Sequence, residues 1–367
     1  MSDRKYLIAH NASPILGGGE IWTARLLAGL QSRGHRVLLL CRNAEVKNEL
    51  AEYGIPTQTL VLRGDAMFSD AIRFAWMLNS ERPDALLLTT YQKTWLGGMA
   101  ASLARTPRLV IRVGALPKRP GALTYRIALA RWIDAVAVNA DTLRGPMIAA
   151  LPTVPTEKFV TIHDGIRAHT PDNSRVGIRK ELGIPANAPV IGSVGRLVKQ
   201  KRYDRLVRAC AMLPSDVHCV IAGDGSDMAS LEDLAREMGI EDRLHLPGFR
   251  ADTAALLTAL DVFVISSDFE GMANAMLEAM AAGIPVVSTR VSGSEEALHP
   301  PSSGGPPPGI IVGFEPDDIS TAVSRLLADS SLRASMGEEG IRRVSEHFSF
   351  EGMLDQWERL LWGNFPS

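Results

Sequence analysis

Strand-like and helix-like stretches alternate along the whole chain, and this alternation constrains its fold more than any other feature. Residues 5–10 and 36–41 are short apolar runs typical of strands, and the amphipathic residues 21–33 between them are typical of a helix. The same pattern recurs through the rest of the first half. Repeated β-α units of this kind predict an α/β protein with a parallel, doubly wound sheet.

A polar stretch that contains proline interrupts the pattern, which restarts at "VIGSVG" and runs nearly to the end. We predict an N-terminal Rossmann-like domain over residues 1–170, a linker over 171–188 and a second Rossmann-like domain over 189–348. Residues 349–367 are expected to form a helix that packs back on the N-terminal domain. Ligands of open α/β domains bind at the carboxyl ends of the strands, so the expected site is the crevice between the domains.

The net charge of −2 conceals an uneven distribution. Residues 1–170 contain 21 Lys and Arg against 13 Asp and Glu, whereas residues 171–367 contain 18 against 28. A basic N-terminal domain predicts an anionic partner, such as a membrane surface or an acidic acceptor. A simple imbalance that helps the two halves dock explains the counts equally well.

The cysteine pattern and the N-terminus indicate the compartment. The three cysteines lie in or beside apolar runs without metal-ligand spacing, so we expect reduced thiols and no disulfide framework. The chain passes from "MSDRK" straight into a strand-like run and has no 18 consecutive apolar residues. These features predict a cytoplasmic protein that is neither secreted nor membrane-spanning, and we expect no nucleic-acid partner.

Two loops that follow strands are candidates for binding an anion. In "SPILGGGE", residues 13–20, three glycines precede a helix expected to begin near Glu20, and a helix N-terminus offers unpaired N–H groups to a phosphate. The stretch lacks the G-x-G-x-x-G pattern, which argues against a nicotinamide site. In "GSVGRLVKQKRYDRL", Arg196 and Lys201 flank a turn and are close enough in sequence to converge on one diphosphate. Solvated surface cations are the alternative interpretation.

Two glutamates stand eight residues apart in "SSDFEGMANAMLEAMAAGIPVVST". On a single helix Glu270 and Glu278 would be about 12 Å apart along the axis. This is too wide for the carboxylate pair of a retaining glycosidase, which is about 5.5 Å apart. With Glu270 in a loop and Glu278 on a helix that starts near Ala273, the two acids can instead hold the two ends of an extended ligand by its hydroxyls. A nucleotide-sugar has hydroxyls at both ends and a diphosphate between them.

These segments resemble the retaining glycosyltransferases of family 4, which have a GT-B fold of two facing Rossmann-like domains. The resemblance is close in the second half, in "GRLVKQKRYDRLVRA", "VIAGDGSDMASLEDLA", "LHLPGF" and the stretch with the two glutamates, and rests on "GGGE" and "HDGI" in the first. Glu270 and Glu278 meet the family's E-x7-E signature. The first glutamate of that signature contacts the donor sugar in the family, and the second contacts the nucleotide ribose.

The resemblance also implies a set of site residues. Arg196 and Lys201 stand where the family neutralises the diphosphate, so with Glu270 they are the candidate catalytic residues. The implied donor-binding residues are Gly18, Gly19, Gly195, Arg196, Lys201, Glu270, Gly271, Met272, Ala273, Asn274 and Glu278.

The sequence departs from the family pattern at three places. Many members carry a histidine after the strand that corresponds to "RLVIRV", where this chain has Arg112. A cation there suits an anionic acceptor or indicates altered catalysis, and Arg112 is therefore a fourth candidate catalytic residue. His163 and Asp164 replace a common Pro-Asn pair, and Ser292 replaces a common glycine.

The expected reaction needs no metal and no cofactor. Cations and helix amides can stabilise the leaving diphosphate as charge develops, and no D-x-D motif occurs. The family resemblance implies retention by front-face attack. The expected function is transfer of a hexosyl unit from a nucleotide-diphosphate sugar, UDP- or GDP-linked, to a lipid-linked, lipopolysaccharide or polysaccharide-precursor acceptor.

Residues 114–134 mix lysine and arginine with apolar and aromatic residues, and the acceptor is expected to meet this N-terminal domain. Such a basic amphipathic segment can lie on anionic lipid, which would make the protein peripheral on the inner face of the cytoplasmic membrane. A helix buried on its apolar side fits the same residues. Three other functions stay open: a sugar phosphorylase of related fold, a nucleotide-sugar epimerase, and an inactive nucleotide- or carbohydrate-binding scaffold.

Overall fold

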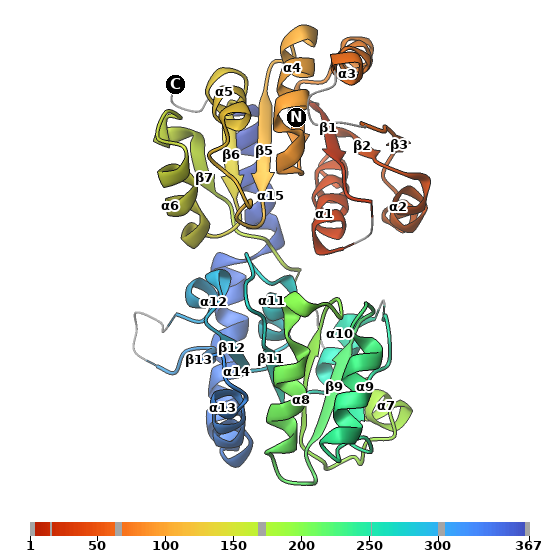
Figure 1. Ribbon diagram of the computed structural model, residues 1–367, viewed down its shortest axis with the longest axis vertical. Coiled ribbons are helices and arrows are strands. Elements are labelled where there is room, and N and C mark those ends of the chain that lie inside the picture. Colours follow the sequence, from red (N-terminus) through yellow and green to blue (C-terminus); the bar gives the residue numbers. More distant parts are fainter. Residues whose placement is uncertain are drawn as a thin grey trace. The chain divides into compact units, whose positions relative to one another are not determined.

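The computed structural model describes residues 4–14, 17–62, 68–167, 174–250, 252–299 and 305–363. The chain divides into two compact units (Figure 1). Met1–Asp164 and Glu351–Ser367 form the first unit, and Gly165–Phe350 forms the second. None of the helices in the described ranges combines the length and apolar character needed to cross a bilayer.

The first unit contains a parallel sheet with the strand order β3-β2-β1-β4-β5-β6-β7 in the described residues. Its strands are β1 (Tyr6–Asn11), β2 (Arg36–Cys41), β3 (Thr57–Thr59), β4 (Ala85–Leu88), β5 (Leu109–Val113), β6 (Ala135–Val138) and β7 (Phe159–Thr161). Its helices are α1 (Gly18–Ser32), α2 (Ala44–Glu49), α3 (Phe68–Glu81), α4 (Thr94–Ala104), α5 (Leu123–Arg131), α6 (Asp141–Ala150) and α15 (Phe350–Trp362), with 3₁₀ turns η1 (Leu50–Tyr53), η2 (Tyr91–Lys93) and η3 (Thr156–Lys158).

The central strands β1 and β4 are buried along their whole length and are mostly apolar, as expected where helices cover both faces of a sheet. Successive side chains point to opposite faces of a strand, and Ile8 joins the core under α3 and α4. The last helix, α15, is part of the same unit: Trp357 packs against Trp22 of α1 with ring centroids 5.4 Å apart. Three acids of α15, namely Glu351, Asp355 and Glu358, form ion pairs with Arg33 at 2.7–3.0 Å.

The sheet of the second unit, β10-β9-β8-β11-β12-β13, repeats the order of the first six strands of the first unit, and all its pairs are parallel. Its strands are β8 (Val190–Val194), β9 (His218–Ala222), β10 (Leu244–His245), β11 (Val262–Ile265), β12 (Val286–Thr289) and β13 (Gly309–Val312). Its helices are α7 (Ser174–Glu181), α8 (Tyr203–Ala211), α9 (Met228–Glu237), α10 (Thr253–Thr258), α11 (Asn274–Ala281), α12 (Ser292–Ala297), α13 (Pro316–Ala328) and α14 (Ser330–His347), with the 3₁₀ turn η4 (Lys199–Lys201).

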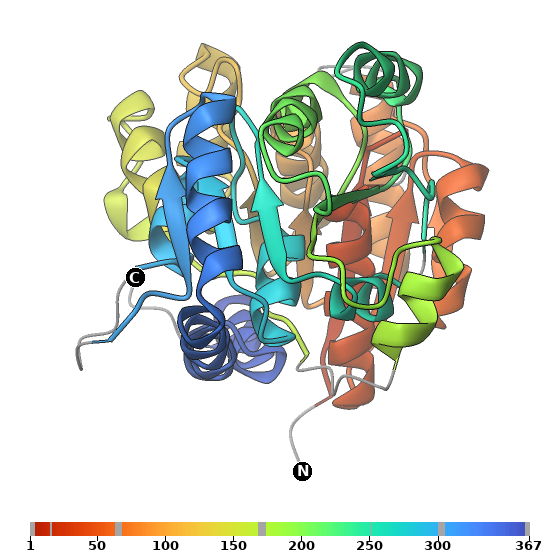
Figure 2. The same ribbon diagram turned by 90° about the horizontal axis from the view of Figure 1, so that it is seen from below.

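Helices cover both faces of the second sheet as well (Figure 2). On β11, Phe263 and Ile265 belong to the core under α10 and α11, whereas Val262 and Val264 belong to the core under α8 and α13. The helix α7 lies inside the range 171–188, which the sequence predicted as a linker, and its Arg179 is buried against Asp261 of this unit at 2.9 Å.

Both sheets therefore have the Rossmann order, in which the strand order reverses next to the first strand of the unit. Ligands of open α/β sheets bind outside the carboxyl ends of the strands at this reversal. In the second unit the reversal lies between the neighbouring strands β8 and β11. The two loops that leave these strands are thus where a binding site is expected.

Candidate active site

The loops after β8 and β11 meet through a lysine and a glutamate. Nζ of Lys201 lies 2.5 Å from Oε1 of Glu270, and Oγ of Ser267 donates a hydrogen bond to the same carboxylate oxygen at 2.8 Å. The side chains of Lys201 and Glu270 are 21% and 12% exposed. Both side chains are therefore mostly buried, but each keeps some surface that a ligand can contact.

Further hydrogen bonds join the two loops along their length. The N–H of Asp268 donates to the carbonyl of Gln200 at 3.0 Å, and Nε2 of Gln200 donates back to the carbonyl of Phe269 at 2.9 Å. Oγ of Ser266 donates to the carbonyl of Lys201 at 2.9 Å. Because these bonds fix the backbone on both sides of the ion pair, the pair is preorganised.

A small cavity of about 10 Å³ lies behind the pair, lined by Ser193, Tyr203 and Ala273 among others. This is about the room that one water needs. Burial raises the pKa of the Tyr203 hydroxyl well above its ordinary value, and the charge of Glu270 adds to the rise, while a hydrogen bond with Ser193 opposes it. The hydroxyl beneath Glu270 is therefore neutral at physiological pH.

Glycines let the loop after β9 press against the loop after β8. A Cβ on Gly223, whose φ is +148°, would lie 1.9 Å from the carbonyl oxygen of Gly195. A Cβ on Gly195 itself would lie 2.7 Å from the hydroxyl oxygen of Tyr203. Close packing therefore favours glycine at both positions, whatever the role of Gly195 towards a ligand.

The N-terminus of α11 continues the site. Gly271 and Met272 are buried in the preceding loop, Ala273 is the N-cap residue, and the carbonyl of Gly271 accepts from the N–H of Gly293 at 2.9 Å. Oδ1 of Asn274 is buried and has no hydrogen-bond partner among the described residues. A buried acceptor without a partner is costly, so this atom is available for a donor group of a ligand.

Glu278 lies on α11, four residues after Asn274 and so on the same face of the helix, and it is half-buried. Glu270 lies in the loop before the helix. The structure thus confirms the predicted arrangement of one glutamate in a loop and one on a helix. Arg196 is exposed in the loop after β8, and no described residue pairs with its guanidinium.

In the first unit, Gly17 is the N-cap of α1, which begins at Gly18, two residues before Glu20, near which the sequence predicted its start. A Cβ on Gly18 or Gly19 would meet nothing within 4 Å, so packing inside this unit does not require glycine at either position. Nδ2 of Asn11, the last residue of β1, donates to Oε1 of Glu20 at 3.1 Å and ties the first turn of α1 to the strand.

Arg112 does not stand at an open strand end. It lies within β5 and is 8% exposed, and its Nη2 donates to both carboxylate oxygens of Asp164 at 2.8 and 2.9 Å. Its guanidinium also stacks over the ring of Trp22 at 3.8 Å, and Nδ2 of Asn139 donates to Asp164 at 3.2 Å. A Cβ on Gly114 would lie 2.9 Å from Nη1 of Arg112. These contacts occupy the guanidinium inside the unit, in contrast to the acceptor-facing position that the sequence predicted.

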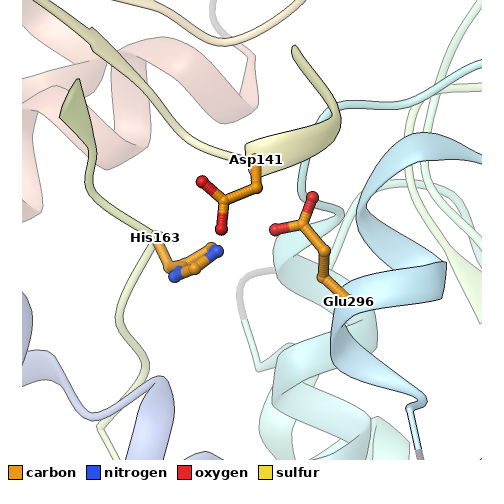
Figure 3. Close-up of side chains that lie close together, drawn as sticks. All are labelled: Asp141, His163 and Glu296. Atoms are coloured by element: carbon orange, nitrogen blue, oxygen red, sulfur yellow. The ribbon is translucent and has the colours of Figure 1, made fainter. Parts of the chain in front are cut away.

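Asp141 and His163 of the first unit follow β6 and β7, and Figure 3 draws both with Glu296 from α12 of the second unit. The carboxylate of Asp141 accepts a hydrogen bond from the hydroxyl of Thr161. Two ligands from one unit do not complete a metal site by themselves.

Sequence reasoning missed several residues that build the site. Ser266 and Ser267 orient the loop and the carboxylate of Glu270, and Tyr203 forms the floor beneath it. A pair of serines directly after a strand is a detectable signal, because hydroxyls there can hold a loop. Asp164, the partner of Arg112, gave no such signal, since 52 residues separate the two.

Two protein-family models match the chain. The glycosyl transferase 4-like domain matches residues 17–165, and the glycosyl transferases group 1 model matches residues 175–343. Together the two matched ranges cover most of the chain.

Curated relatives match part of the chain. The lipopolysaccharide core biosynthesis glycosyltransferase LpsE of Rhizobium meliloti (strain 1021) is 36% identical over 184 residues, which are 50% of this chain and 52% of LpsE. The D-inositol 3-phosphate glycosyltransferase of Kineococcus radiotolerans is 31% identical over 263 residues, which are 66% of this chain and 60% of that protein. The chain spans about half the length of the first of these relatives.

Among solved structures, Alr3699/HepE of Anabaena in complex with UDP and glucose is similar over 98% of this chain and 99% of that chain, with a TM-score of 0.85 and 21% identity. A likeness at this identity concerns the fold. The two family models and the shared fold agree with the presence of Lys201 and Glu270 where the strand order of the second sheet reverses. The chain therefore belongs to the family 4-type glycosyltransferases of group 1, whose GT-B fold it shares.

Proposed function

We propose that this glycosyltransferase moves a hexosyl unit, with retention, from a nucleotide-diphosphate sugar to a lipid-linked, lipopolysaccharide or polysaccharide-precursor acceptor. The observation that carries the proposal is the ion pair of Lys201 and Glu270 at the carboxyl ends of β8 and β11. A cation and a carboxylate fixed side by side fit a ligand in which a diphosphate adjoins a sugar.

The donor binds along the second unit in the proposed mode. Glu270 accepts hydrogen bonds from sugar hydroxyls and Glu278 from ribose hydroxyls, while Lys201 and Arg196 compensate the diphosphate. Asn274 lies between the two glutamates in sequence. In this mode its buried Oδ1, which has no partner among the described residues, accepts a hydrogen bond from a ligand hydroxyl. The solved complexes of HepE with UDP and with UDP-glucose support a uridine nucleotide as the first donor to try.

Stabilisation of the leaving group is the proposed source of the rate enhancement. Cleavage of the bond between the anomeric carbon and phosphate leaves negative charge on the diphosphate, and Lys201, Arg196 and the amides that open α11 meet this charge as it develops. Metal is dispensable in this scheme. In its support, Asp268 pairs with Arg205 at 2.7 Å and Glu270 with Lys201, so the two acids of this loop already have cationic partners.

The acceptor belongs to the cell envelope in this proposal. Two relatives, LpsE and LpsD of Rhizobium meliloti, are named for lipopolysaccharide core biosynthesis, and the N-terminal half of this chain is basic, which suits an anionic acceptor at a membrane. The basic residues 114–134 then contact the inner leaflet of the cytoplasmic membrane.

A panel of nucleotides tests the proposal first. Thermal unfolding of the full chain with UDP, GDP, ADP or TDP should show stabilisation by one of them, because only a ligand of the folded state raises the melting temperature. The matching nucleotide-sugars are then assayed for transfer to lipid-linked glycan acceptors with and without EDTA, and the anomeric configuration of the product is read by NMR. Transfer with retention, at an unchanged rate in EDTA, is expected. Sugar release that depends on free phosphate would instead identify a phosphorylase.

A further inference from the structure

Helix α3 turns a row of large apolar side chains away from the protein. Phe68, Ile72 and Trp76 are spaced four residues apart, so they share one face of the helix, and they are 69%, 50% and 78% exposed. The opposite face carries Ala71 and Phe74, which are fully buried in the core. The exposed row is therefore not needed to hold α3 on the sheet.

The neighbouring helices also expose large apolar side chains. α4 packs against α3 (Figure 1). Leu103 of α4 is 60% exposed. α5 packs against α4, and its Leu123 and Ile127, again four residues apart, are 68% and 40% exposed. Large apolar side chains that are exposed on helices packed against one another are typical of an interaction site. We call the exposed side chains of α3, α4 and α5 the apolar row.

The charges that follow α3 in the chain, from β4 through α4 and α5, have one sign. Residues 85–133 contain eight lysines and arginines and no aspartate or glutamate. Lys118, Arg119 and Arg131 in or beside α5 are exposed. On α3 itself Arg73 is exposed, Asp70 is buried and paired with it at 3.1 Å, and Glu81 is 30% exposed and paired with Arg36 at 2.9 Å. A partner of this surface must accordingly offer an apolar region to the exposed side chains and negative charge to the neighbouring cations.

An anionic bilayer has this combination, with acyl chains beneath acidic headgroups. A second copy of the chain docking through the same face would oppose cations to cations, because a two-fold interface pairs each patch with itself. Tryptophan favours the boundary between headgroups and acyl chains, where its ring is apolar and its N–H stays wet. We infer that the apolar row inserts into an anionic membrane leaflet, with Ile72 and Trp76 as the inserted side chains and the cations of α5 on the headgroups.

This inference rests on the proposed function only in that a lipid-linked acceptor makes membrane binding useful. Its test needs neither donor nor acceptor, so the two can fail separately. The full chain and the variant Ile72→Ser/Trp76→Ser are sedimented with vesicles of phosphatidylcholine alone or with about 30% phosphatidylglycerol. Val176, 68% exposed on α7 of the second unit, supplies the matched control Val176→Ser.

The wild type and Val176→Ser are expected to bind the anionic vesicles, and the double variant to bind about tenfold or more weakly, because two inserted side chains are lost. Lys118→Ala/Arg119→Ala should weaken binding to anionic vesicles and leave binding to neutral ones unchanged. Melting temperatures near that of the wild type verify that the variants fold. Equal binding by wild type and Ile72→Ser/Trp76→Ser would overturn the inference, and so would vesicle-free self-association that the double variant abolishes, since the row would then be an interface between copies.

Discussion

Lys201 and Glu270 are 69 residues apart in the chain, yet Nζ of the lysine lies 2.5 Å from Oε1 of the glutamate. The Rossmann order explains the contact, because it makes β8 and β11 neighbours and brings their carboxyl ends together. Lys201, proposed for the diphosphate, and Glu270, proposed for the sugar, thus come from two loops that are adjacent because their strands are neighbours in the sheet.

The first prediction concerns the carboxylate. Glu270→Gln keeps the shape of the side chain but removes its charge, so it should lower the rate of sugar transfer by about a hundredfold or more. Glu295→Gln is the matched control, because Glu295 forms an exposed ion pair with Arg290 and should change the rate by about twofold at most. Initial rates with saturating acceptor measure both. Equal rates for Glu270→Gln and the wild type would remove Glu270 from the mechanism.

The second prediction separates a structural from a catalytic role for Arg112. Arg112→Met leaves the buried carboxylate of Asp164 without its cation and should destabilise the first unit by about 3–5 kcal/mol. Arg112→Met/Asp164→Leu should recover much of this loss, because no buried charge is left unpaired. Denaturant unfolding measures both. If the double variant is stable but inactive, Arg112 acts in the reaction after all.

The third prediction concerns pH. Burial, with a contribution from Lys93, lowers the pKa of His10 to about 3, and neither ring nitrogen has a partner among the described residues. The unfolded chain binds a proton on His10 near pH 6.5 and the folded chain does not, so stability is full above this pH and falls towards pH 3. At pH 5 the loss is about 2 kcal/mol, from 1.5 pH units at about 1.4 kcal/mol each.

His10→Leu should remove this part of the pH dependence, and His347→Leu, at an exposed position, should not. Melting temperatures at pH 7 and pH 5 report the difference. A His10→Leu variant that loses as much stability as the wild type between these two values would show that His10 is not the group responsible.

The fourth prediction concerns the support of the Gly195 loop. Gly223→Ala forces a Cβ into the carbonyl of Gly195 and should cost about 3 kcal/mol or more. Gly239→Ala adds a Cβ at a φ of +65°, in the left-handed helical region, with nothing within 4 Å, and should cost only about 1 kcal/mol. Unfolding free energies compare the two. Equal costs would contradict the predicted clash of a Cβ on Gly223 with the loop after β8.

Much of the fold could be predicted from the sequence, because it depends on patterns of residues that are close together in the chain. Apolar strand runs and amphipathic helices predict the two parallel sheets, since each pattern has its own period. The position of Glu270 in a loop and Glu278 on a helix follows from Gly271 and from the apolar run after it. The predicted start of α1 near Glu20 is within two residues of the observed start at Gly18, since the glycines themselves adopt the first helical turn.

Contacts between distant residues could not be predicted in this way. The sequence left Arg112 as an unpaired cation near an acceptor, because nothing local reveals that Asp164, which follows the predicted strand "KFVTIH", reaches Arg112 of β5. The exposed row on α3 was missed for a related reason. Ile72 and Trp76 fit an ordinary amphipathic helix until the burial of the opposite face shows that they point outwards.

The most direct measurement of the central claim is calorimetric titration of the full chain and of Lys201→Met with the nucleoside diphosphate that stabilises it best and with the corresponding nucleoside. If Lys201 compensates the diphosphate, Lys201→Met should bind the diphosphate about tenfold or more weakly, because a charge-assisted contact is lost, while binding of the nucleoside is unchanged. Equal affinity of wild type and Lys201→Met for the nucleoside diphosphate would contradict the account.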